Sequence, residues 1–146
     1  MQDMKIFSLS LLLSSYFIFN CMNAIDENAL ESLSLVCNLS KHVHISAKPS
    51  NMAETLVAKY FPQFMWVVRD FALQMVDENE NEINAKQYLE NALRSAEVDR
   101  ETMGDNADLV LRKNEIRKVL QTMFQERDCA VLFRPVADEK RLREIN

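Results

Sequence analysis

The order of elements along the chain predicts an α/β fold with a parallel sheet and flanking helices. Two short runs, F-M-W-V-V at residues 64–68 and C-A-V-L-F at residues 129–133, are continuously apolar and have the length of buried strands. Residues 111–125 instead repeat apolar residues at helical spacing, namely Ile116, Val119, Leu120, Met123 and Phe124. Strands that alternate with helices are typical of parallel sheets. We predict three strands, fewer than such sheets usually have, so the chain is expected to be part of a domain.

Residues 1–24 allow two interpretations. A lysine, an apolar run and a final alanine occur in the order of a secretory signal peptide. Alternatively, a buried helix over residues 3–13 leads into a buried strand over residues 15–20. The apolar helix positions at helical spacing are Ile6, Leu9 and Leu13. The run is short and rich in serine, so no membrane span is expected, and periodicity does not decide between a signal peptide and internal elements.

A helix and a loop are predicted after the first strand. Asp26 is a suitable N-cap for a helix over residues 27–42. The expected apolar face of this helix comprises Leu30, Leu33, Val36, Cys37 and Ser40. Residues 46–53 are polar and are expected to form a loop.

The segment between the second and third strands begins with the acidic run D-E-N-E-N-E at residues 77–82. A solvated loop is expected there, because the run lacks the Gly turn and the distal Glu of a calcium-binding loop, which is the weaker alternative. Asn84 and Gln87 predict a capping box for a helix over residues 85–96. Its apolar side comprises Tyr88, Leu89, Ala92 and Leu93. Residues 97–108 are polar and are expected to form a loop.

The single glycine of the 146-residue chain excludes several kinds of site. A phosphate-binding G-x-x-x-x-G-K-[ST] loop and a G-x-S-x-G nucleophile elbow need two glycines each, and a G-x-G-x-x-G dinucleotide turn needs three. Gly104 therefore completes none of them. The net charge of −5 gives neither a basic footprint for nucleic acid nor a polybasic membrane signal, so no nucleic-acid partner is expected.

The three cysteines, Cys21, Cys37 and Cys129, are an odd number at long spacings, without a C-x-x-C pair. This pattern disfavours a disulfide framework or a zinc ribbon and predicts buried, reduced thiols in a cytoplasmic protein. Cys37, His42 and His44 form C-x4-H-x-H, which is not a recognised zinc spacing, so no metal site is expected. Nothing in the pattern favours a catalytic cysteine–histidine pair, and we assign no catalytic residue.

Ligands of open parallel sheets bind beyond the carboxyl ends of the strands. In this chain the residues at those ends are Asn20-Cys21-Met22, Arg69-Asp70 and Arg134-Pro135. Arg69-Asp70 is the most suggestive pair, because a carboxylate can accept a ring N–H and an adjacent amino N–H together, which guanine offers and adenine does not. The neighbouring guanidinium can stack on a base or donate hydrogen bonds to it. A surface ion pair or a helix cap is the alternative, and spacing alone favours that alternative.

Residues 61–74, F-P-Q-F-M-W-V-V-R-D-F-A-L-Q, resemble the segment of guanylate-binding proteins around their Arg-Asp guanine-specificity motif. The resemblance continues through Q-Y-L-E-N-A-L at residues 87–93, K-N-E-I-R at residues 113–117 and R-D-C-x-x-L-x-R-P at residues 127–135. Upstream, I-F-S-L-S-L-L-L-S-S-Y-F-I-F-N resembles W-I-F-A-L-A-x-L-L-S-S-x-F-x-Y-N of the same family. The match covers about residues 5–146 and favours these dynamin-related large GTPases over the atlastins, which share the Arg-Asp.

The resemblance implies that residues 1–146 are the C-terminal half of a P-loop GTPase-like domain, which binds GTP or GDP and hydrolyses GTP with Mg²⁺ when complete. Asp70 would recognise guanine with Arg69 beside it. Arg134 and Pro135 would begin the loop that covers the base and contributes to a homodimer. In the family, the phosphate loop and the switches lie upstream of the segment that this chain resembles. The chain alone is therefore expected to be inactive and without a cofactor. The apolar N-terminal run would be an internal helix, and the protein cytoplasmic.

Two hypotheses of other classes remain. The chain could be a non-enzymatic fragment or interaction remnant with an incomplete sheet and exposed edges. It could also be a small secreted α/β protein with a signal peptide. An in-frame phosphate-loop motif in the upstream coding sequence would favour the GTPase, and an expressed product with intact residues 1–24 would exclude the secreted protein.

Overall fold

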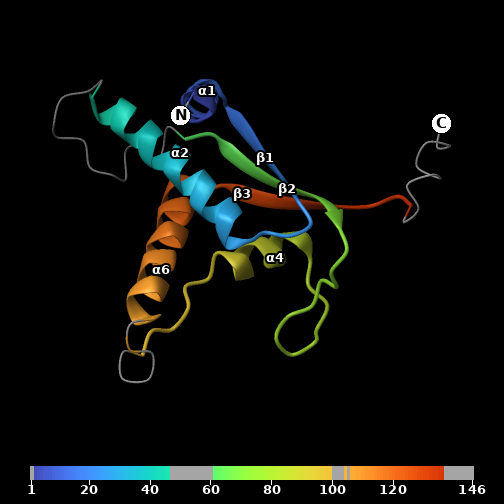
Figure 1. Cartoon of the computed structure of the whole chain (residues 1–146). Helices are drawn as coiled ribbons and strands as arrows, with labels where there is room; N and C mark the ends of the chain where they lie inside the picture. Colours follow the sequence, from blue (N-terminus) through green and yellow to red (C-terminus); the bar gives the residue numbers. More distant parts are fainter. Residues whose placement is uncertain (1, 47–60, 100–103, 105, 137–146) are drawn as a thin grey trace.

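The computed structural model describes residues 2–46, 61–99, 104 and 106–136. Within these ranges the elements are α1 (Gln2–Leu13), β1 (Tyr16–Met22), α2 (Glu27–Ser46), β2 (Gln63–Phe71), α4 (Ala85–Ala92), α6 (Asn106–Met123) and β3 (Arg127–Phe133) (Figure 1). The three described strands pair in parallel in the order β1-β2-β3. This arrangement confirms the α/β class and the parallel sheet with flanking helices.

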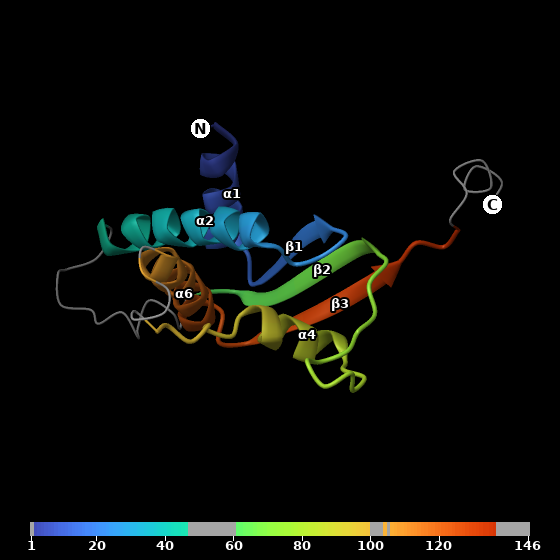
Figure 2. The ribbon, with the colours of Figure 1, turned by 60° about the horizontal axis from the view of Figure 1, so that its bottom comes forward.

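The helices pack against one face of the sheet, where Phe64 and Trp66 of β2 are almost completely buried. Phe7 of α1 meets the ring of Phe17 edge to face, and Phe124, which follows α6, stacks on Phe64 with ring centroids 4.3 Å apart. Figure 2 shows α2 and α6 side by side and α4 along β3, in agreement with their contacts. Burial of these aromatic rings, together with the leucines of the helices, removes apolar surface from water and stabilises the fold.

The opposite face of the sheet carries many apolar side chains but is largely exposed. Its side chains include Tyr16, Ile18, Met22 and Leu132, which are between 46% and 59% exposed. The prediction that the apolar run of β2 is buried on both faces is therefore wrong for Met65 and Val67, which are only partly buried. The run is continuous because both faces are apolar, but the described helices contact only one of them.

α1 buries a different stripe from the one predicted. Ile6, Leu9 and Leu13 are between 56% and 77% exposed, whereas Leu11 is 1% exposed. Phe7 and Leu11 form a second apolar stripe at i, i+4 spacing. Because the helix is apolar on more than one side, its periodicity could not identify the side that faces the sheet.

The helix that follows the acidic loop has the predicted start but an earlier end. The capping box of α4 is confirmed, with the Asn84 and Gln87 side chains each accepting the other's backbone N–H at 2.8 Å. The helix ends at Ala92 rather than at the predicted residue 96. The side chain of Asn114 explains this end, because it accepts the N–H of Ala96 at 2.9 Å and donates to its carbonyl at 2.8 Å in place of helical bonds.

Other boundaries differ by a few residues from the prediction. α6 begins at Asn106, inside the predicted loop, and buries Ala107 in its first turn. α2 continues to Ser46, the first residue of the predicted loop over residues 46–53. The rest of that predicted loop lies outside the described residues. The expected apolar faces are confirmed for Leu30, Leu33, Val36 and Cys37 of α2, and for Leu89 and Leu93 around α4. No described helix is both long and apolar enough to cross a membrane.

Candidate functional site

The carboxyl ends of the three strands bring the predicted segments to one edge of the sheet (Figure 1). Met22 of β1 lies opposite Arg69 of β2, and Phe71 of β2 lies opposite Phe133 of β3. Arg134 follows directly after that last pair. In a parallel sheet this is the edge where ligands bind.

Asp70 is the extra residue of an irregularity in β2. Phe64, Trp66 and Val68 alternate into the core, so a regular strand would place residue 70 there as well. Instead the register shifts between Arg69 and Phe71, and Phe71 takes the core position at 2% exposure. The extra residue therefore turns the Asp70 carboxylate out of the core, as bulges beside functional sites commonly do.

The backbone at this edge adopts positive φ at two positions without using glycine. Asp70 has a φ of 53° and Asn23, just after β1, a φ of 67°. Asp and Asn are the residue types that tolerate this region best after glycine, although the conformation still costs roughly 1 kcal/mol. The Asn23 N–H donates to the Arg69 carbonyl at 2.8 Å, which ties the two strand ends together. Strained backbone of this kind is concentrated at functional sites.

The Arg69 side chain is held at one of its nitrogens. Its Nε–H donates to Oδ1 of Asn20 at 2.9 Å, and both side chains are exposed. Among the described residues, neither the two terminal nitrogens of Arg69 nor the Asp70 carboxylate forms a hydrogen bond or an ion pair. The expected alternative, a surface ion pair or helix cap, thus receives no support from the described part of the chain.

Arg134 and Pro135 lie beyond the end of β3 and are exposed. They share the edge with Arg69 and Asp70 through the pairing of β2 with β3. Residues 137–146, which would continue the predicted covering loop, lie outside the described residues.

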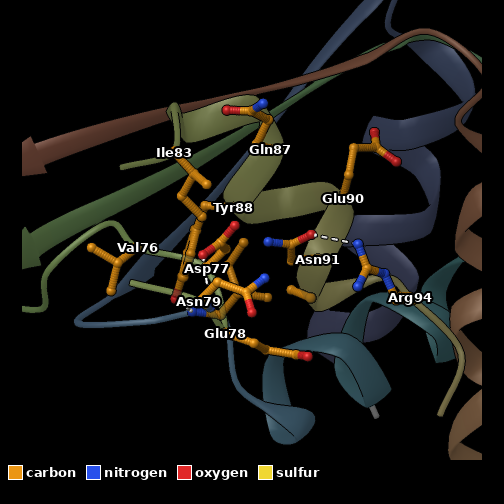
Figure 3. A pocket seen from close by; sticks show the side chains of 12 residues that line it. Val76, Asp77, Glu78, Asn79, Ile83, Gln87, Tyr88, Glu90, Asn91 and Arg94 are labelled. Carbon is orange, nitrogen blue, oxygen red and sulfur yellow. Dashed lines mark hydrogen bonds between the residues drawn. The ribbon is translucent and has the colours of Figure 1, made fainter. Parts of the chain in front are cut away.

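A hollow of about 760 Å³ lies between α4 and the loop that follows β2 (Figure 3). Asp77 faces this hollow, and its carboxylate accepts the backbone N–H groups of Asn81 and Asn79. The bonds from Asn81, followed by the one from Asn79, hold the pKa of Asp77 below its ordinary value. None of the predicted site residues lines the hollow. The acidic loop beside it forms a turn whose hydrogen bonds run between its own residues.

The cysteines are free thiols, as predicted, with Cys37 and Cys129 buried and Cys21 half-buried. Burial raises the pKa of Cys37 to about 12, which keeps the thiol protonated and unreactive. The sulfur of Cys21 accepts the indole N–H of Trp66 at 3.0 Å. Of the C-x4-H-x-H pattern, only the Cys37 side chain belongs to the described part. Across the described residues, no three His, Cys, Asp or Glu side chains gather as metal ligands.

Two contributions to this edge were missed from the sequence. The sequence predicts Asn20 as a strand-end residue, but its hydrogen bond to Arg69 depends on the pairing register of β1 and β2. The positive φ of Asn23 carried a weak signal, because an Asn directly after a strand in a chain with almost no glycine is the expected substitute at such a turn.

The chain is similar in sequence to the members of one protein family. The sequence model of the family "Guanylate-binding protein, N-terminal domain" matches residues 1–146. Guanylate-binding protein 6 of Mus musculus is 35% identical over 147 residues, covering 99% of this chain and 23% of that relative. Guanylate-binding protein 3 of Mus musculus is 36% identical and guanylate-binding protein 6 of Homo sapiens 34% identical, each over 98% of this chain and 22% of the relative. The chain spans less than a quarter of the length of these relatives. It belongs to the guanylate-binding protein family.

Proposed function

We propose that the carboxyl edge of the sheet binds the guanine base of GTP or GDP. In this proposal the Asp70 carboxylate accepts the N1–H and the 2-amino N–H of guanine. Arg69 lies beside it and offers its planar guanidinium to the base as a stacking surface or as a donor to ring acceptors. Arg134 and Pro135 begin the segment that covers the other side of the base.

The observation that carries the proposal is the position of Asp70. A bulge places its carboxylate at the carboxyl end of the central described strand, in a strained backbone conformation, with no recorded partner among the described residues. A paired carboxylate would have to lose its partner before binding a base, whereas this one has no partner to lose within the part of the chain that the structure describes. The family relationship supports the same ligand class, since the relatives are named for guanylate binding.

The selectivity follows from hydrogen-bond chemistry. Guanine presents two adjacent N–H groups to a carboxylate, whereas hypoxanthine presents one. Adenine has an unprotonated N1 that faces the carboxylate as a second acceptor. A site that hydrogen-bonds its ligand rejects analogues that leave its polar groups unpaired. Loss of one hydrogen bond to the carboxylate is expected to weaken binding about tenfold.

We further propose that the chain provides base recognition within a protein that binds and hydrolyses GTP. The phosphate chemistry of such proteins depends on a G-x-x-x-x-G-K-[ST] loop and on Mg²⁺, which neutralises charge on the phosphates. The 146 residues contain no such motif, and the described residues offer no cluster of ligands for the ion, so we assign no Mg²⁺ ligand to this chain. The purified chain is therefore expected to release no phosphate from GTP.

Nucleosides test the base site without involving phosphates. We expect an NMR titration of the chain with guanosine to give saturable shifts at Asp70 and Arg69, with a dissociation constant on the order of millimolar. Inosine should bind about tenfold more weakly, and adenosine should give no saturable shift at these residues. Equal affinity for guanosine and adenosine would contradict the proposed base site. Release of phosphate from GTP by the purified chain would contradict the proposal that the chain provides base recognition alone.

The exposed apolar face of the sheet favours a second candidate function, that of an interaction module. Ile18 and Leu132 lie on this face and are 59% and 51% exposed. Apolar patches rimmed by polar groups commonly mark protein contacts, and a second copy of the chain is the simplest partner. Sedimentation of the chain should then depend on its concentration, and Ile18→Glu should remove that dependence. A chain that stays monomeric at every concentration would contradict self-association.

A further inference from the structure

We infer that Asn20 is a positioning residue for the guanine site, and that it acts by fixing the orientation of the Arg69 guanidinium. The inference rests on the proposed function, because it concerns how Arg69 meets the base. It adds a residue from β1 to a site otherwise formed by β2 and the end of β3.

The register of the sheet places the two side chains together. Asn20 pairs with Val67, and Met22 pairs with Arg69, so Asn20 lies diagonally behind Arg69 on the neighbouring strand. Val67 and Arg69 point to the same face because side chains alternate along a strand. Asn20 shares that face, and its Oδ1 lies 2.9 Å from the Arg69 Nε.

The hydrogen bond uses the Nε–H of Arg69, the inner nitrogen of the guanidinium. With Nε–H bound to Asn20, the direction of the planar guanidinium is fixed while both terminal nitrogens stay available among the described residues. The Arg69 backbone is held as well, since its carbonyl accepts the Asn23 N–H at 2.8 Å. Arg69 is thus restrained at its backbone carbonyl and at its guanidinium before a ligand arrives.

The consequence concerns binding more than folding. A hydrogen bond between two exposed side chains adds little to stability, because water replaces either partner. An exposed arginine, however, loses many rotamers when it is ordered against a ligand, and prior ordering reduces that loss. Removing the Asn20 acceptor should therefore weaken guanosine binding about two- to tenfold while the fold persists.

Three variants separate this effect from a general structural one. Asn20→Leu removes the acceptor with little change in volume, and Asn20→Asp keeps an oxygen that can accept the Nε–H. Gln63→Leu is the matched control, because it also removes a hydrogen bond of an exposed side-chain amide. That bond runs from Gln63 to Glu126 at the opposite end of the same sheet.

Two readouts are taken on the full chain: the exchange of the Arg69 Nε–H with water, followed by NMR, and the dissociation constant for guanosine. Asn20→Leu should make the Nε–H exchange several times faster and should weaken guanosine binding two- to tenfold. Asn20→Asp should restore slow exchange, and Gln63→Leu should change neither readout.

The outcomes distinguish the inference from the proposed function. If the unmodified chain shows no preference for guanosine over adenosine, the proposed function fails and the inference fails with it. If the unmodified chain prefers guanosine but Asn20→Leu binds it equally well, the positioning role alone is overturned. Slow Nε–H exchange in Asn20→Leu would also overturn it, because Arg69 would then be held by something else.

Discussion

The charged side chains at the two ends of the sheet differ in how completely they are paired. At the amino end, Arg127 donates from Nε and Nη2 to both carboxylate oxygens of Glu90, at 2.9 and 2.7 Å, and from Nη1 to the Phe124 carbonyl at 2.9 Å. At the carboxyl end, Arg69 has one side-chain bond and Asp70 has none recorded among the described residues. Fully paired charges stabilise a fold, whereas available charges at a strained edge can bind a ligand.

The environment of each arginine supports this contrast. The Arg127 side chain is only 17% exposed, so its bidentate pair is shielded from water and joins β3 to α4. Arg117 behaves similarly, with its guanidinium on Glu27 of α2 and its Nε–H on the Ala92 carbonyl. Arg69 is exposed and spans only two strand ends. The comparison predicts stability losses at the paired arginines and binding losses at the exposed one.

The largest effect is expected for Arg127→Ala. The substitution leaves the half-buried Glu90 without its partner and the Phe124 carbonyl without a donor, so the free energy of unfolding should fall by about 2–4 kcal/mol. Urea unfolding followed by fluorescence of the buried Trp66 measures this. Arg127→Lys, which keeps the charge but not the bidentate geometry, should lose about half as much. If Arg127→Ala lowers the free energy of unfolding by less than about 0.5 kcal/mol, the proposed contrast between the two ends of the sheet is wrong.

A smaller effect of opposite sign is expected for Asp70→Gly. Glycine adopts a φ of 53° without the steric penalty of roughly 1 kcal/mol but loses more backbone entropy on folding, so this variant should raise the free energy of unfolding by at most about 0.5 kcal/mol. Asp128→Gly is the comparison at a regular position of β3, where glycine relieves no strain and also removes the acceptor of the Cys129 N–H, so it should destabilise by at least about 0.5–1 kcal/mol. If both variants destabilise equally, the backbone at Asp70 is not strained.

The smallest change in stability is expected for Arg69→Gln. Arg69 is exposed, and its side chain forms one hydrogen bond to the described residues, so its replacement should change the free energy of unfolding by less than about 0.5 kcal/mol. Guanosine should nevertheless bind about two- to fivefold more weakly, because the planar charge beside the base is lost. The same urea and NMR measurements report both quantities. A large stability loss with unchanged guanosine affinity would assign Arg69 a structural role.

Patterns that depend on local chemistry were predictable from the sequence. The capping box of Asn84 and Gln87 and the buried stripe ending in Leu120, Met123 and Phe124 depend on residues close together in the chain. The strand ends that carry the candidate site followed from the apolar runs and the parallel arrangement. These features needed no knowledge of long-range pairing.

Features that depend on register or on a distant partner could not be predicted. The bulge at Asp70 is visible only once Phe71 is seen to take the core position opposite β3. The early end of α4 depends on Asn114, which is 18 residues from its partner Ala96. The buried side of α1 was ambiguous because Leu9 and Leu11 are equally apolar, and only packing places Leu11 inside.

Replacement of Asp70 by Asn tests the central claim most directly. The amide oxygen can still accept the N1–H, but the amide nitrogen now donates, which suits the 2-oxo group of xanthine and opposes the 2-amino group of guanine. The measurement is the ratio of the dissociation constants for guanosine and xanthosine, in the chain and in its Asp70→Asn variant. We expect a ratio that favours guanosine in the chain and xanthosine in the variant. An unchanged ratio would contradict the assignment of Asp70 to guanine.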